Sequence, residues 1–361
     1  MTASSRRWPA EWEPHRATWL SWPHNEETWP ADVMPDVEDA FCEIVRAIAP
    51  GEAVEINVVD AAMGERVLAR LRDAGVEPIE RVRVHVVPTD DAWMRDHGGI
   101  FVQSGEGAAA RLELMDFAFD AWGGKYPPWD RDANVAAEMA RIADVPRVES
   151  KFVLEAGSIE GDGAGTILTT ESCLLNPNRA RPGQDRSREA LEAMLGETLG
   201  AKRVLWLGDG IEGDDTDGHV DDLTRFVAPG RVVTAEASDS GDSDHAVLAD
   251  NRARLGEMTD AAGRRLDVVE LPMPGAVMGP EGRLPASYAN FYFANAALLV
   301  PTFGTDADRE AIAILERVAD RPVVPIPARR LVIGFGTVHC VTQQEPAIAP
   351  LDTPMVMQRT S

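Results

Sequence analysis

The stretch "LTRFVAPGRVVTA", from Leu223 to Ala235, contains the repeating element of this chain. Two runs rich in β-branched residues flank the turn residues Pro229 and Gly230, a pattern typical of a hairpin. A stretch with helical spacing follows at residues 251–263, and a short apolar run that predicts a strand follows at residues 266–272. The unit is therefore predicted to be a hairpin, then a helix, then a strand.

The same order recurs along the chain without obvious sequence identity. Three further units are predicted, each as a hairpin, a helix and a strand, at residues 98–115, 134–143 and 149–155; at residues 157–170, 187–200 and 202–208; and at residues 290–303, 308–319 and 321–327. A related unit is predicted near the N-terminus, with strands at residues 17–23 and 53–59 and a helix at residues 37–49. Roughly five units favour a closed, propeller-like α/β ring, a single domain over residues 1–361, rather than two unrelated domains.

Composition narrows the class of protein. The 361 residues are 44% hydrophobic and 26% charged, as in a globular chain with ample material for a core. No apolar run reaches the ~18 residues of a membrane span, and the N-terminus lacks the apolar core of a signal peptide. Cys42, Cys173 and Cys340 are too few and too scattered for a disulfide framework or a zinc cluster. We expect a cytoplasmic protein with reduced thiols and no membrane partner.

The net charge of −25 argues against a nucleic-acid partner, because a polyanion would be repelled. The acidic residues are spread over the whole chain, which predicts a uniformly acidic surface. Adaptation to high salt is the favoured explanation for this acidic surface. Steering of a cationic substrate is the alternative.

One thiol and one imidazole stand out among the chemically active residues. Cys340 lies in "GFGTVHCVTQQ", residues 334–344, which alternates like a strand. His219 and Asp221 lie in "DDTDGHVDDLTRF", and on a strand these two side chains would share a face. The acidic density there resembles a calcium loop, but with Gly218 aligned to the loop glycine the first ligand would be Gly213 and the last, normally glutamate, would be Thr224, so no metal is predicted. The alternative for His219 and Asp221 is a solvated acidic turn.

Further acidic residues precede predicted hairpins. Trp93 and Asp96 come just before one hairpin, and Glu155 ends an apolar strand just before another. A buried carboxylate needs a partner, so Glu155 either belongs to the site or forms a structural salt bridge with an arginine. His339 is adjacent to Cys340, but neighbours on an extended segment face opposite ways, which favours His219 as its base. Cys42 and Cys173 are predicted to be core residues.

A thiol, an imidazole and several carboxylates indicate a particular chemistry. The carboxylates imply a small cationic substrate, and a planar guanidinium matches carboxylate geometry. Its carbon is a poor electrophile, which calls for a thiolate whose pKa the bound cation lowers. His219 would protonate the departing ammonia and then activate water.

Several motifs make the chain similar to the agmatine deiminases, members of the guanidine-modifying superfamily called penteins, and to bacterial peptidylarginine deiminases. They are "PAEWEPHRATWLSWP", "AWMRDHGGIFV", "FDAWGGKYPPWDRD", "LEAGSIEGDGAGTILTTESCLLNPNR", "WLGDGIEGDDTDGHVDDLTRF", "ASYANFYFANAALLVP" and "GTVHCVTQQEPA", and they cover nearly the whole chain. The resemblance implies a five-bladed α/β propeller. It also implies hydrolysis of agmatine to N-carbamoylputrescine and ammonia, without metal or organic cofactor.

The resemblance also implies roles for individual residues. Cys340 would form an amidino-cysteine intermediate, His219 would be the acid and base, and Glu155 would orient it. The remaining assignments concern substrate binding: Asp96 and Asp221 would grip the guanidinium, Trp93 would lie along the methylene chain, Gly157 would border the site, and Asn290, or else the nearby Asn295, would contribute a polar group.

The chain departs from the family pattern at three places. His97 follows Asp96 where asparagine is common, Ala156 and Gly157 stand where two glycines are usual, and Phe335 interrupts a glycine run before Cys340. These changes put the preference for agmatine in question. The alternatives are another guanidino compound, peptidyl-arginine, or a non-catalytic guanidino-ligand binder, and a homo-oligomer is left open.

Overall fold

The computed structural model describes residues 6–348 apart from residues 106 and 281. The helices are α1 (Met34–Ile48), α2 (Ala61–Asp73), α3 (Met94–His97), α4 (Ala121–Gly124), α5 (Val135–Ala143), α6 (Glu171–Leu174), α7 (Arg188–Leu199), α8 (His245–Glu257) and α9 (Ala307–Val318). The strands are β1 (Arg6–Arg7), β2 (His15–Ser21), β3 (Ala53–Val58), β4 (Val82–Val86), β5 (Ile100–Ser104), β6 (Arg111–Ala118), β7 (Arg147–Val153), β8 (Ile159–Gly161), β9 (Thr166–Thr170), β10 (Arg203–Leu207), β11 (Thr224–Ala228), β12 (Arg231–Glu236), β13 (Asp267–Pro272), β14 (Met278–Gly279), β15 (Gly282–Arg283), β16 (Tyr292–Phe293), β17 (Leu298–Thr302), β18 (Val323–Pro327) and β19 (Gln343–Pro346).

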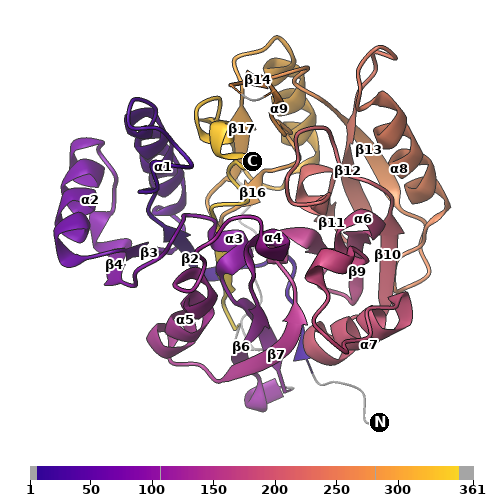
Figure 1. Ribbon diagram of the computed structural model, residues 1–361, viewed down its shortest axis with the longest axis horizontal. Coiled ribbons are helices and arrows are strands. Elements are labelled where there is room, and N and C mark those ends of the chain that lie inside the picture. The colour runs from indigo at the N-terminus through magenta and orange to yellow at the C-terminus, as the bar shows by residue number, and fades with distance from the viewer. Residues whose placement is uncertain (1–5, 106, 281, 349–361) are drawn as a thin grey trace, which may run out of the picture.

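The predicted hairpin–helix–strand unit is confirmed four times. In each case two strands pair antiparallel, a helix follows, and the next strand pairs parallel to the second strand of the hairpin. The four units are β5–β6–α5–β7, β8–β9–α7–β10, β11–β12–α8–β13 and β16–β17–α9–β18. Figure 1 shows these α/β units following one another around the middle of the molecule, with α5, α7 and α8 toward the outside.

The N-terminal unit is completed from the other end of the chain. Strand β2 pairs parallel to β3 across helix α1, and its antiparallel partner is β19, whose Gln343 lies opposite Trp19. The sheet order β19-β2-β3-β4 thus repeats the pattern of the other units, with one further parallel strand reached through α2. Residues near the two ends of the described chain therefore share one sheet.

One helix is displaced from its predicted place. The spacing predicted a helix over residues 251–263, whereas α8 runs from His245 to Glu257. Its end is set by Asp260, whose Oδ1 accepts hydrogen bonds from the backbone N–H groups of Ala262 and Arg264 and so holds a turn. Such side-chain capture of backbone donors competes with a helix, which explains the early end.

The largest apolar cluster joins the first and last units. It includes Leu20 of β2, Phe41 of α1, Ile56 of β3, Leu298 of β17 and Ile326 of β18, all at most 1% exposed. Helix α1 contributes because its apolar side chains recur every three to four residues and face the sheet. Among the described residues, no helix combines the length and apolar character that a bilayer crossing needs.

Candidate active site

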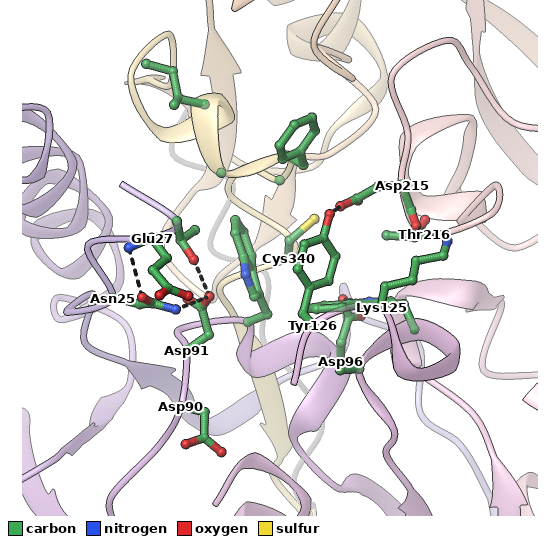
Figure 2. A pocket seen from close by; sticks show the side chains of 18 of the residues that line it. Asn25, Glu27, Asp90, Asp91, Asp96, Lys125, Tyr126, Asp215, Thr216 and Cys340 are labelled. Carbon is green, nitrogen blue, oxygen red and sulfur yellow. Dashed lines mark hydrogen bonds between the residues drawn. The ribbon is translucent and has the colours of Figure 1, made fainter. Parts of the chain in front are cut away.

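Four of the sequence-predicted site residues come from different parts of the chain and line one cavity of about 1150 Å³, whereas Glu155, Gly157, Asp221 and Asn290 lie behind its wall. Trp93 directly precedes α3 and Asp96 lies within it. His219 directly precedes a 3-10 turn at Val220–Asp222. Cys340 lies in a turn that precedes β19. All four side chains line the cavity. Figure 2 shows Asp96 and Cys340 facing this space.

Two predictions about local backbone were wrong. His219 and Asp221 do not lie on a strand, because Asp217 and Gly218 adopt left-handed backbone (φ 70° and 98°) and break the chain direction there. Cys340 likewise lies in a turn rather than on an alternating strand. Asp221 is nevertheless fully buried, which rules out the solvated acidic turn.

Gly157 lies where three site residues converge. A side-chain carbon at this position would come within 2.6 Å of His219 Nδ1, 2.8 Å of Asp96 Oδ1 and 3.1 Å of Asp221 Oδ2. The first two contacts are shorter than side-chain carbons normally make, so any larger residue here would displace His219 or Asp96. His219, Asp96 and Asp221 therefore surround one point next to the cavity.

Three buried carboxylates each have one oxygen held and one oxygen without a hydrogen-bond partner among the described residues. Asp96 Oδ2 accepts a hydrogen bond from Trp122 Nε1 (3.0 Å), while its Oδ1 has none. Asp221 Oδ2 contacts His339 Nδ1 (2.6 Å), while its Oδ1 has none. An unpaired buried polar atom is costly, so these oxygens indicate a site built for a cation.

Glu155 is the third carboxylate with one oxygen held and the other without a hydrogen-bond partner among the described residues. Its Oε1 accepts a hydrogen bond from Arg179 Nε (3.0 Å), and its unpartnered Oε2 lies 3.9 Å from His219 Nε2. The other ring nitrogen of His219 lies 3.8 Å from Asp96 Oδ1. The structural salt bridge considered for Glu155 is thus present, and the same carboxylate also faces the imidazole.

Asn290 holds the turn that carries the thiol. Its Nδ2 lies 3.1 Å from Cys340 Sγ, and its Oδ1 accepts hydrogen bonds from Thr337 Oγ1 (2.6 Å) and the backbone N–H of His339 (3.0 Å). Asn295 instead bonds backbone groups of His15 and lies outside this cluster. Of the two asparagines, Asn290 is the one beside the thiol.

The ring of Trp93 lies against the same turn. A side-chain carbon at Gly336 would come within 2.5 Å of the Trp93 ring and 3.0 Å of Cys340 Cβ. Phe335, which precedes it, lines the cavity and has left-handed backbone at φ 70°, a conformation that is strained for a non-glycine residue. The turn therefore presents the thiol beside an aromatic wall.

The carboxylates set the electrostatics of the thiol and the imidazole. Burial, followed by Asp221, Asp222 and Asp96, raises the pKa of Cys340 well above its usual value. Burial opposes the charged form of His219, but Asp96 and other acidic neighbours outweigh it and raise the pKa of His219 well above its usual value. Without a bound cation the site thus favours a protonated thiol and an imidazolium.

Sequence reasoning missed several residues that hold the site. Trp122 hydrogen-bonds Asp96 from a backbone with φ 57°, and Arg179, fully buried, pairs with Glu155. Asp222 Oδ1 accepts a hydrogen bond from Asn290 Nδ2 (3.0 Å). The motifs "FDAWGG" and "LNPNR" contain two of these residues, but nothing in the local pattern indicates which way their side chains point.

Cys173 is buried, as predicted for a core residue, yet it also borders the site. Polar atoms of Cys173, Glu155 and His219 lie within 4.8 Å of one another. This donor set could bind a metal ion, but Arg179 and Arg186 lie close enough to interact electrostatically with Cys173. Two fixed positive charges oppose a divalent cation there, so the trio does not fit a metal centre.

The proteins that this chain resembles are consistent with the geometry of the site. The family model described as Porphyromonas-type peptidyl-arginine deiminase matches residues 7–346. The chain belongs to this deiminase family. Among curated members, the agmatine deiminase of Ectopseudomonas mendocina (strain ymp) is 39% identical over 363 residues, covering 94% of this chain and 95% of that protein.

Solved structures of deiminases share the fold. The agmatine deiminase of Enterococcus faecalis superposes with a TM-score of 0.85 at 34% identity, over 96% of this chain and 98% of that chain. A C. jejuni agmatine deiminase with substrate bound superposes with a TM-score of 0.84 at 27% identity, over 96% of this chain and 97% of that chain. The deiminase fold thus extends over nearly the whole chain.

Proposed function

We propose that this protein hydrolyses agmatine to N-carbamoylputrescine and ammonia through a covalent amidino-cysteine. The observation that carries the proposal is the set of unpartnered carboxylate oxygens on Asp96, Asp221 and Glu155 beside Cys340 and His219. Within the described part of the chain, these oxygens have no hydrogen-bond donor as a partner. A guanidinium supplies several donors in one plane together with a positive charge. Relatives named agmatine deiminase, at 37–39% identity over nearly the full length, support the same substrate.

The reaction would proceed in two displacements. The bound cation offsets the negative field of Asp96 and Asp221 and so lowers the pKa of Cys340, whose thiol proton passes to solvent to leave the thiolate. The thiolate attacks the guanidinium carbon, a C–S bond forms, and the C–N bond to one terminal nitrogen breaks as His219 donates a proton to the departing ammonia. His219 then takes a proton from water, whose oxygen attacks the same carbon; the C–S bond breaks with its electron pair returning to the thiolate of Cys340, and the added hydroxyl loses its proton to solvent as the ureido product is released.

The cavity favours a second positive charge over a carboxylate at the far end of the substrate. Its wall carries acidic side chains away from Cys340, including Glu27, Asp91 and Asp215 (Figure 2). The lining cations Lys125 and Arg283 are already paired, Lys125 with Asp217 (2.9 Å) and Arg283 with Asp242 and Asp244 (2.6 and 2.8 Å). An amine such as that of agmatine therefore fits better than the α-carboxylate of arginine.

The fold proposal follows from the repeated units. We infer that the five sheets of three or four strands are the blades of a pentein-type α/β propeller formed by one catalytic domain, with β19 completing the first blade and the two-stranded sheet β14-β15 lying outside the blades. The pairing of β19 with β2 supports this inference, because it joins the ends of the succession of blades.

Ammonia release from agmatine, arginine and an arginyl peptide tests the proposal, with Cys340→Ser as the blank. Agmatine should be turned over with the highest kcat/KM. A preference for the arginyl peptide would support peptidyl-arginine deimination, and binding without any release would support a non-catalytic binder.

A further inference from the structure

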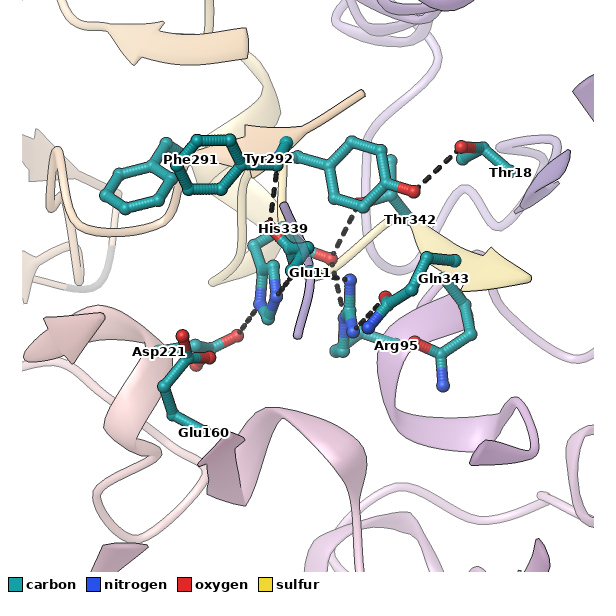
Figure 3. A network of polar contacts seen from close by, with 12 residues as sticks. Glu11, Thr18, Arg95, Glu160, Asp221, Phe291, Tyr292, His339, Thr342 and Gln343 are labelled. Atoms are coloured by element: carbon teal, nitrogen blue, oxygen red, sulfur yellow. Dashed lines mark hydrogen bonds and ion pairs between the residues drawn. The ribbon is translucent and has the colours of Figure 1, made fainter. Parts of the chain in front are cut away.

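A buried network of polar groups lies behind Asp221, on the side away from the cavity (Figure 3). His339 stands between two carboxylates: its Nδ1 is 2.6 Å from Asp221 Oδ2 and its Nε2 is 2.8 Å from Glu11 Oε2. The imidazole is 1% exposed, and Glu11 and Asp221 are 5% and 0% exposed. No solvent separates these three groups, so each contact must be a direct hydrogen bond.

Two hydrogen bonds in this chain of three groups require two protons. A neutral imidazole has only one N–H, so it can donate to one carboxylate, and its bare nitrogen would then repel the other carboxylate at hydrogen-bond distance. A second proton removes this conflict, either on the ring or on one of the carboxyl groups. Burial, Arg225 and Arg95 outweigh the carboxylate neighbours and lower the pKa of His339. Against the effect of burial, Arg225 and His339 lower the pKa of Glu11 and His339 lowers the pKa of Asp221, so these shifts alone do not favour a second proton. The two short contacts decide the proton count, because neither forms without a hydrogen between its atoms.

The charges around His339 lead to the same count. Arg225 Nη2 lies 2.9 Å from Glu11 Oε1, Arg95 Nη2 lies 3.3 Å from Glu11 Oε2, and Arg225 Nε donates to Glu160 Oε2 (2.9 Å). Three carboxylates and two guanidiniums leave one uncompensated negative charge in a buried cluster. At a pH above about 7, where Glu160 is ionised, a second proton on the Asp221–His339–Glu11 chain neutralises the cluster, which avoids the desolvation cost of a buried net charge.

We propose that Asp221, His339 and Glu11 share two protons, and that His339 is a positioning residue that fixes the carboxylate of Asp221 beside Cys340, where the substrate guanidinium would bind. This inference rests on the proposed function. The imidazole holds Asp221 Oδ2, which also lies 3.9 Å from Cys340 Sγ, while Asp221 Oδ1 has no hydrogen-bond partner among the described residues. Glu11, from the segment before β2, anchors the far side of the ring.

The imidazole is not needed to hold the turn that carries Cys340. The backbone N–H of His339 donates to Asn290, and its carbonyl accepts a hydrogen bond from Arg95 Nε (3.3 Å). The backbone N–H of Arg95 donates to the carbonyl of Cys340 (3.0 Å). Because main-chain atoms fix the turn, the side chain of His339 is free to serve Asp221.

Two amide substitutions separate the two contacts of His339. His339→Asn places an amide N–H near the position of Nδ1 and can still donate to Asp221, whereas His339→Gln places it near Nε2 and can donate only to Glu11. Both variants are made in the Cys340→Ser protein, and agmatine binding is measured by calorimetry. The Kd of the His339→Asn variant should lie within about threefold of the Kd of the Cys340→Ser parent. The affinity of the His339→Gln variant for agmatine should be about 10- to 150-fold lower, which corresponds to the loss of one charge-assisted hydrogen bond. His85→Gln, which removes an imidazole–carboxylate pair of 2.6 Å on the outer strand β4, is the matched control and should bind as the parent does.

Proton NMR of ligand-free enzyme measures the proton count without any substrate. Burial raises the pKa of Glu160 to about 7, so the spectrum is recorded at about pH 8, where Glu160 is ionised. Two strongly hydrogen-bonded, low-field protons should disappear together in His339→Gln. A single such proton overturns the two-proton chain, and an Asn variant that binds no better than the Gln variant overturns the positioning role. Failure of the parent to bind agmatine, with two low-field protons present, would count against the proposed substrate and leave the proton chain standing.

Discussion

We expect the ionised carboxylate of Asp96, which is placed to bind a cation, to destabilise the folded protein when no cation is bound. It is 5% exposed, and burial, together with Asp221 and Glu155, raises its pKa to about 7 even though His219 opposes the shift. Each pKa unit corresponds to about 1.4 kcal/mol, so keeping this carboxylate ionised above pH 7 costs the folded state about 4 kcal/mol relative to an unfolded pKa near 3.9. The cost is absent below about pH 4, where both states are protonated, and it grows as the pH rises to about 7.

Asp96→Asn removes this charge and keeps an oxygen that can accept the hydrogen bond from Trp122. We expect urea unfolding to show a gain of up to about 4 kcal/mol at about pH 8 and about 1.5 kcal/mol at about pH 5. Activity should fall at least ~100-fold, because one partner of a desolvated guanidinium is lost.

The matched control is Asp162→Asn. Asp162 is also buried, but its oxygens accept hydrogen bonds from the backbone of Ala164 and from the backbone and hydroxyl of Thr166, so an amide there should destabilise the protein. The reasoning is refuted if Asp96→Asn is no more stable than the parent at about pH 8, or if its gain is the same at about pH 5.

Four further outcomes are expected. Cys340→Ser should abolish turnover while retaining agmatine binding, and intact-mass spectra of the parent under turnover should show an amidino adduct on Cys340; full activity of the variant would contradict the nucleophile assignment. Asp221→Asn should lower kcat/KM at least ~100-fold, and a loss below about tenfold would argue against a contact with the guanidinium. Arg179→Leu leaves Glu155 buried without its partner and should lower the free energy of unfolding by about 3–5 kcal/mol in urea titrations; unchanged stability would contradict this. The melting temperature should rise from low to molar KCl, because screening relieves repulsion in a chain of net charge −25, and a flat or falling series would contradict salt adaptation.

The hairpin–helix–strand units were predictable because the apolar period changes from two to about 3.6 residues within each of them. The partner of β2 was not, since β19 lies more than 300 residues away and no local pattern links the two. The extent of α8 was also missed, because the capture of backbone donors by Asp260 is a property of the folded turn.

The chemistry of the site was predictable from residue types, but its geometry was not. Cys340 and His219 stood out because thiols and imidazoles are rare in this chain and lie among carboxylates. The strand assumed for His219 failed at Gly218, whose left-handed backbone has no distinctive local pattern. Trp122 and Arg179 were missed because their contribution depends on the direction of a side chain across the fold.

The pairing of β19 with β2 has a consequence for protein synthesis. Cys340 lies three residues before β19, so the nucleophile and the strand that joins the two ends of the chain leave the ribosome almost together. A product terminated before Cys340 lacks both and cannot use this nucleophile, however much of the chain has folded. Catalysis thus begins only after Cys340 has been translated, and copies that end before this residue remain inactive.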